Sequence, residues 1–257
     1  IAVLANYSLH YVGGVPTGHL SADYFAVFAR KLGERLGTDP LHDPPFVGIL
    51  SNGTSGDVNN IDVKSPPKPA LPAYAKMNLV ADDLARRVAE TYAKVEFRDR
   101  APLASASREL VLKIRRPTPE ELAFAREVMA RPAGAPKYHN LEQSFARRIM
   151  DHQEGPAEVS ILLQAFRVGD LGIAAIPFEV FAEMGLDIKA RSPFKPTFTM
   201  ELANGTYGYL PTPRHFEVGG YETWLGVNRV EPEAAPKITA VILDLLGGLD
   251  PARKATP

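Results

Sequence analysis

Two apolar runs in the second half of the chain each end in a cluster of polar residues. Residues 171–177 are followed by Glu179, and residues 197–203 are followed by a segment, 204–209, that contains two tyrosines. In open α/β sheets, ligands bind outside the carboxyl ends of the strands. Two strands of one sheet would therefore bring both clusters to the same edge. The pattern predicts a site in which a carboxylate and phenol groups converge.

The composition limits the chemistry that such a site can perform. The 257 residues include no cysteine, so a metal ion would have to be held by His, Asp, Glu or Tyr side chains. The formal net charge is -1 and Lys and Arg are scattered along the chain, so we expect no nucleic-acid partner. No apolar run approaches the roughly 18 residues of a transmembrane helix, so no membrane span is predicted.

One histidine follows the first predicted strand. Residues 1–9 are mostly apolar and lead into His10, and the turn residues Gly13 and Gly14 follow shortly after. A neutral imidazole nitrogen is a good zinc ligand, at a distance of about 2.0 to 2.1 Å. A histidine in such a position more often hydrogen bonds to the loop backbone. Position alone therefore leaves both roles open.

The order of these motifs resembles the neutral, non-lysosomal ceramidases, a family of zinc amidohydrolases. The shared features are Pro177 and Glu179 in the pattern Pro-x-Glu, Asn204 with two tyrosines, a Thr-Pro pair, and the pair Tyr221 and Glu222. Most of the chain can be laid along the later part of the family's catalytic domain. The resemblance implies hydrolysis of an amide or ester bond in a small, lipid-like molecule. It also implies a secreted or periplasmic protein.

The resemblance assigns ligands for Zn²⁺ in this chain: His10, Glu179 and Tyr209. Tyr209 is favoured over Tyr207 because the match across residues 204–221 has no gap. A phenol is an unusual ligand, because the metal must lower a pKa that is ordinarily about 10. The family's His-x-His motif, which supplies the first ligand, has no counterpart here. We therefore expect an N-terminal segment of the same protein to precede this chain and to supply that ligand.

The resemblance also assigns the catalytic groups: Tyr221, Asn59 and Asp57. Tyr221 matches a tyrosine that hydrogen bonds the oxyanion of the tetrahedral intermediate. Asp57 and Asn59 lie in a loop that matches Gly-Asp-Val-Ser-Pro-Asn, with Asn59 in place of the serine. An amide is not a nucleophile at neutral pH, which excludes a covalent mechanism through this position, but Asn59 can still donate to a carbonyl oxygen. Phe178 replaces a glycine of the family, and we expect it to narrow or reshape the pocket.

Strands and helices alternate along the chain without a repeat, which predicts an α/β fold. We expect a single domain over residues 1–257, with a mixed β-sheet flanked by helices and with the N-terminal portion of the sheet missing from this chain. Residues 158–168 and 171–176 predict a β-hairpin around a Gly-Asp turn. Residues 179–190 predict a helix.

Two further local signals are clear. Thr118, Pro119 and Glu121 form a capping-box pattern that predicts the start of a helix. The neighbouring pair Arg115 and Arg116 is expected to be solvated at the end of a strand.

Two alternatives to a zinc hydrolase remain. The first is a non-catalytic protein on the same fold that binds a lipid-like or amide ligand, which the substitution at Asn59 favours. The second is a serine hydrolase with an unrelated triad, for which no Ser, His and Asp spacing stands out. Retention of all three assigned ligands favours the zinc hydrolase.

Overall fold

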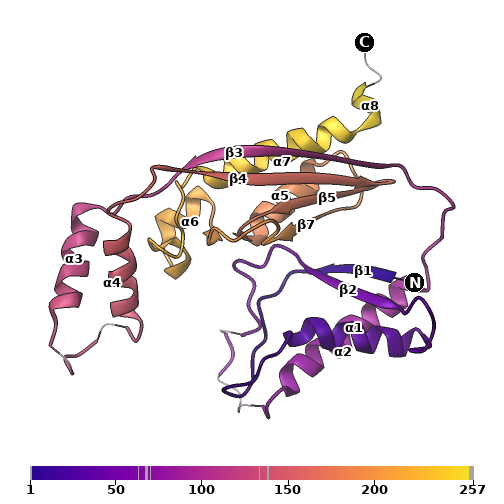
Figure 1. Ribbon diagram of the computed structural model, residues 1–257, viewed down its shortest axis with the longest axis horizontal. Coiled ribbons are helices and arrows are strands. Elements are labelled where there is room, and N and C mark those ends of the chain that lie inside the picture. Colours follow the sequence, from indigo (N-terminus) through magenta and orange to yellow (C-terminus); the bar gives the residue numbers. More distant parts are fainter. Residues whose placement is uncertain are drawn as a thin grey trace. The chain divides into compact units, whose positions relative to one another are not determined.

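The structure, a computed structural model, has two compact units, Ile1–Pro102 and Leu103–Pro257 (Figure 1). We call these unit 1 and unit 2 and describe each by itself. The residues that the structure describes are 2–62, 64–66, 69, 71–132, 134–137 and 139–254. Over these ranges, no helix combines the length and the apolar character needed to cross a lipid bilayer.

Unit 1 is a pair of parallel strands with two helices. Its elements are β1 (Ala2–Tyr7), α1 (Asp23–Arg35), β2 (Val47–Asn52) and α2 (Ala75–Tyr92). The helices pack on each other around a core that includes Tyr24, Phe28, Leu32, Met77 and Leu84. The strands pair from Ala2 opposite Val47 to Tyr7 opposite Asn52. Because they are parallel, the loops that follow them leave from the same edge.

Unit 2 is built on a four-stranded mixed sheet. Its strands are β3 (Leu103–Lys113), β4 (Glu158–Val168), β5 (Leu171–Ile176) and β7 (Thr197–Glu201), in that spatial order. β4 is antiparallel to both β3 and β5, and β5 is parallel to β7. β4 and β5 form the predicted hairpin. This is the mixed sheet flanked by helices that the sequence predicts.

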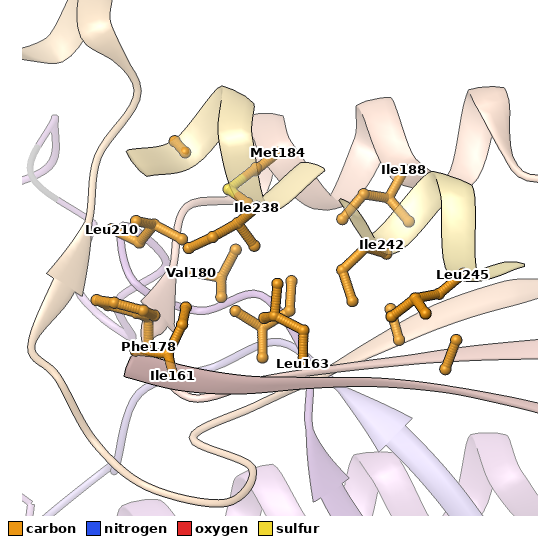
Figure 2. Packing of buried hydrophobic residues seen from close by; sticks show 14 of the residues in the cluster. Ile161, Leu163, Phe178, Val180, Met184, Ile188, Leu210, Ile238, Ile242 and Leu245 are labelled. Atoms are coloured by element: carbon orange, nitrogen blue, oxygen red, sulfur yellow. The ribbon is translucent and has the colours of Figure 1, made fainter. Parts of the chain in front are cut away.

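Two helices of unit 2 build its main core. α5 (Ala182–Arg191) packs against β7, and α7 (Ala234–Leu249) packs against β3, β4 and α5. Figure 2 shows Ile238 and Ile242 of α7 directed toward Ile161 and Leu163 of β4. The remaining elements are α3 (Pro119–Ala130), α4 (Glu142–Asp151), β6 (Glu179–Val180), β8 (Tyr209–Leu210), α6 (Pro213–Val218), the 3-10 helix η1 (Tyr221–Thr223) and α8 (Pro251–Lys254).

The predicted capping box is confirmed at the start of α3. The hydroxyl of Thr118 accepts from the backbone N–H of Glu121 at 3.1 Å, and the Glu121 carboxylate accepts from the backbone N–H of Thr118 at 2.8 Å. Two N–H groups that the helix cannot satisfy internally thus find acceptors.

The helix predicted over residues 179–190 begins later than expected. Glu179 and Val180 form the short strand β6, and α5 starts at Ala182. The N–H of Glu179 donates to the carbonyl oxygen of Gly208 at 3.0 Å, and the N–H of Val180 donates to the buried Glu201 carboxylate at 2.9 Å. Both amides are therefore engaged by neighbouring segments, and this pairing holds them in an extended conformation.

Candidate functional site

The two polar clusters of unit 2 follow neighbouring parallel strands. β5 and β7 are paired up to Ile176 opposite Glu201, so both strands end at one edge of the sheet. The segments beyond them pair again, as β6 and β8, in parallel. Glu179 and Tyr209 are direct partners in this second pairing. The predicted convergence of a carboxylate and a phenol at one edge is confirmed within unit 2.

Gly208 allows the backbone before Tyr209 to lie close to the Val227 carbonyl. Gly208, directly before Tyr209, has a φ angle of 89°. A Cβ atom at this position would lie 2.2 Å from the carbonyl oxygen of Val227. The N–H of Tyr209 donates to that same oxygen at 3.2 Å. Only glycine combines this backbone angle with the close approach of the neighbouring segment.

Tyr221 completes a group of three side chains. Its hydroxyl oxygen lies 2.8 Å from the hydroxyl oxygen of Tyr209, and the two rings meet edge to face with centroids 5.6 Å apart. Tyr221 begins η1 after Gly220, whose φ angle is 121°. Tyr221 remains 44% exposed. We call Tyr209 and Tyr221 the tyrosine pair.

Tyr209 is held as a neutral phenol in this environment. Burial raises the pKa of Tyr209 well above its ordinary value, and the hydrogen bond with Tyr221 and the negative charge of Glu179 act in the same direction. Desolvation and a nearby like charge both disfavour the phenolate. This environment therefore favours the protonated form of Tyr209 over the phenolate.

Arg115 corrects an expectation, because it is not a solvated strand end. Its Nη1 donates to the carbonyl oxygen of Thr223 at 2.7 Å and to Oδ1 of Asn228 at 3.0 Å. Arg116 is exposed, yet it donates to four carbonyl oxygens at 2.6 to 3.1 Å, those of His152, Glu154, Gly155 and Pro156. No motif marks these roles in the sequence, since the partners lie far along the chain.

Phe178 also differs from expectation, because it does not face a pocket. Its side chain is fully buried in the main core of unit 2, where Figure 2 shows it beside Ile161. The ring lies 5.6 Å from the ring of Tyr207, measured between centroids. Tyr207 thus packs against the core, and Tyr209 is the tyrosine that reaches Glu179 and Tyr221.

In unit 1, His10 lies where the loops after β1 and β2 meet. Its backbone N–H donates to the carbonyl oxygen of Val58 at 3.0 Å, and its Nδ1 lies 3.4 Å from the hydroxyl of the buried Ser55. Asn52 donates to the same hydroxyl at 3.0 Å. Both the backbone and the ring of His10 are thus tied to the loop that contains Asp57.

Asp57 and Asn59 are exposed residues of that loop. Oδ1 of Asn59 accepts from the backbone N–H of Asn60 at 2.8 Å. This arrangement occupies the carbonyl end of the Asn59 side chain. The structure thus groups His10 with the loop of Asp57 and Asn59 in unit 1, and Glu179 with the tyrosine pair in unit 2.

Comparison of the folds gives a clear likeness. The neutral ceramidase from Pseudomonas aeruginosa matches all of this chain with a TM-score of 0.69 and 15% identity. A structure described as ceramidase complexed with C2 matches with a TM-score of 0.66 and 14% identity. The chain has the fold of part of these ceramidases. It spans about half of their length, 45% and 46% respectively.

Comparison of the sequences does not identify a family. No protein-family model matches the chain. The methylenetetrahydrofolate--tRNA-(uracil-5-)-methyltransferase TrmFO of Anaeromyxobacter dehalogenans is 33% identical over 140 residues, which is 51% of this chain and 27% of that enzyme. A match over about a quarter of that enzyme establishes neither a shared family nor a shared function.

Proposed function

We propose that this chain belongs to a zinc-dependent hydrolase that cleaves an amide or ester bond. One observation carries the proposal: Glu179 and Tyr209 are paired directly, with the hydroxyl of Tyr221 2.8 Å from that of Tyr209. The likeness of the fold to two ceramidases supports the reaction class.

The chemistry of the donor atoms suits zinc. A carboxylate is an ordinary zinc ligand, and a phenol oxygen adds a second oxygen donor beside it. Over the described ranges, no three His, Asp or Glu side chains are grouped so as to hold a metal ion. The proposed ligands Glu179 and Tyr209 are a different kind of set, because one of them is a tyrosine. His10 is proposed as a further ligand on the strength of the sequence motif.

The residues of the chain would then have separate roles in the hydrolysis. Bound zinc would supply a water of lowered pKa and polarise the scissile carbonyl. The Tyr221 hydroxyl, 2.8 Å from that of Tyr209, would donate to the oxygen of the substrate. A neutral phenol aimed at developing negative charge stabilises the tetrahedral oxyanion. We propose Asn59 as a second donor in this role and Asp57 as its neighbour in the catalytic loop.

The substrate class follows from the same likeness. The ceramidase names favour a small-molecule amide or ester with a lipid-like part. The secreted or periplasmic location and the contribution of a preceding N-terminal segment stay predictions.

The test is hydrolysis of a panel of N-acyl amides and acyl esters of short and long chain length. We expect activity that a chelator abolishes and that added Zn²⁺ restores. We expect Glu179→Gln to be inactive, and Glu183→Gln, a change of the same type in the first turn of α5, to stay active. Activity that survives the chelator and the Glu179→Gln change would overturn the proposal.

A second candidate is a non-catalytic protein that binds a lipid-like or amide ligand. The observation in its favour is Asn59, whose Oδ1 is engaged by the backbone of Asn60 and whose side chain cannot act as a nucleophile. Saturable binding of an N-acyl amide without any turnover would support this candidate over the hydrolase.

A further inference from the structure

Arg115 reaches the turn that carries one member of the tyrosine pair. Its Nη1 donates to the carbonyl oxygen of Thr223 at 2.7 Å, and Thr223 is the last residue of η1, which begins at Tyr221. The N–H of Thr223 in turn donates to the carbonyl oxygen of Gly220 at 3.0 Å, which closes the turn. The guanidinium of Arg115 thus fixes the turn from its carboxyl end.

Asn228 connects Arg115 to the other member of the pair. Its side chain is 1% exposed, and its Oδ1 accepts from Arg115 at 3.0 Å. At its other end, Nδ2 donates to the carbonyl oxygen of Tyr209 at 3.0 Å. A buried amide is satisfied only when both ends find partners, and here the two partners are Arg115 and the strand of Tyr209.

Arg115 is itself held in place. Its backbone N–H donates to the carbonyl oxygen of Arg229 at 2.9 Å, and its guanidinium lies 5.2 Å from the centroid of the Phe216 ring. A planar guanidinium stacks on an aromatic face and donates in fixed directions, which a lysine ammonium cannot reproduce. The geometry therefore depends on arginine and not on positive charge alone.

From these contacts we infer that Arg115 and Asn228 are positioning residues that set the distance between the hydroxyls of Tyr209 and Tyr221. Each acts through the backbone carbonyl of an element that carries one tyrosine. The inference rests on the proposed function, which gives the two hydroxyls their roles. The inference adds a positioning role for Arg115 and Asn228, which no sequence motif identifies.

The test observes the two tyrosines directly, without metal or substrate. The chain is labelled with 3-fluorotyrosine, and the ¹⁹F resonances of Tyr209 and Tyr221 are assigned among the nine tyrosines from the Tyr209→Phe and Tyr221→Phe variants. The spectrum is then recorded for Arg115→Lys. We expect both resonances to move, because the lysine cannot hold the turn and Asn228 at once.

Arg116→Lys is the matched control. Arg116 is the next residue and also donates to several carbonyl oxygens, but these belong to residues 152–156. We expect this variant to leave both resonances in place. Equal movement in Arg115→Lys and Arg116→Lys would show a general loosening of unit 2 and would overturn the inference.

A second variant decides the question if Arg115→Lys does not fold. Asn228→Asp keeps an oxygen to accept from Arg115 and removes the donor to the Tyr209 carbonyl, at nearly the same volume. We expect the Tyr209 resonance to move. A folded Arg115→Lys or Asn228→Asp protein with both resonances unchanged would contradict the inference.

The outcome is separate from that of the proposed function. If the protein binds no zinc and hydrolyses nothing, the ¹⁹F spectra still report whether Arg115 and Asn228 position the tyrosine pair. If the protein is an active zinc enzyme and the resonances do not move, the proposed function stands and this inference fails.

Discussion

Glu179 and Tyr209 lie directly opposite each other where β6 and β8 pair in parallel. Paired residues of neighbouring strands present their side chains to the same face of the pair. A carboxylate and a phenol that are 30 positions apart in the sequence therefore stand side by side.

Gly208→Ala should displace Tyr209. The new Cβ would lie 2.2 Å from the carbonyl oxygen of Val227, and the φ angle of 89° would strain any L-residue. Gly219→Ala is the control, because its φ angle is 84° but nothing lies within 4 Å of the added Cβ. We expect each change to cost about 1 kcal/mol or more of unfolding free energy from the backbone angle, and Gly208→Ala to cost clearly more. Urea denaturation measures the difference in unfolding free energy between the two variants. Equal losses of unfolding free energy would show that residue 208 has room for a side chain beside the Val227 carbonyl.

Tyr209→Phe and Tyr207→Phe should differ sharply. Tyr209→Phe removes an oxygen proposed as a zinc ligand, whereas the Tyr207 ring packs against Phe178 and the core. We expect the zinc affinity measured by competition with a chelating dye to fall in Tyr209→Phe and to be retained in Tyr207→Phe. A loss of zinc in Tyr207→Phe alone would show that the wrong tyrosine has been assigned.

Tyr221→Phe should lower turnover while leaving zinc in place. Removal of one donor from an oxyanion site typically lowers kcat by about 10²- to 10³-fold, or about 2.7 to 4 kcal/mol. The Tyr221 side chain is 44% exposed, so the change should affect folding stability little. Steady-state kinetics with the best substrate of the panel checks this prediction. An unchanged kcat in the Tyr221→Phe enzyme would remove the proposed role.

Phe178→Ala should destabilise unit 2 without widening the substrate range. The side chain is fully buried, and truncation of a buried Phe to Ala typically costs about 3 to 5 kcal/mol. Phe97→Ala is the control, since Phe97 is 78% exposed and surface changes usually stay within about 0.5 kcal/mol. Thermal unfolding measures the loss. Wild-type stability together with new activity on bulkier substrates would place Phe178 in the pocket after all.

Much of the fold was predictable because its signals are local. The hairpin of β4 and β5 is marked by a Gly-Asp turn between apolar runs, and Gly169 has the positive φ angle, 62°, that such a turn requires. The start of α3 is marked by a complete capping box. In both cases the residues that determine the structure are neighbours in the sequence.

The parts that sequence reasoning missed depend on partners far along the chain. β6 and β8 have two residues each, too few to show any alternation, and their pairing comes from the approach of residues 177–180 to residues 207–210. β3 extends over a stretch of small residues, 104–107, because β4 provides partners for it as far as Val168. The contacts of Arg115 and the burial of Phe178 likewise depend on partners far along the chain.

Part of the candidate site could be predicted from the strands that precede its residues. Glu179 and Tyr209 follow strands that end at the same edge, and that convergence follows from parallel pairing. The supporting role of Arg115 and Asn228 could not be predicted, because it depends on the backbone carbonyls of Thr223 and Tyr209 and on a contact between two side chains that are 113 positions apart. No spacing of residue types identifies such a contact.

The proposed metal site is tested by the zinc content of the purified, complete protein, measured by elemental mass spectrometry. The same measurement is made on Glu179→Ala and His10→Ala, with Glu183→Ala as the control. We predict about one zinc per chain in the wild type and the control, and a loss of zinc in both other variants. A folded wild-type protein without zinc, or Glu179→Ala and His10→Ala variants that retain it fully, would contradict the proposed zinc site.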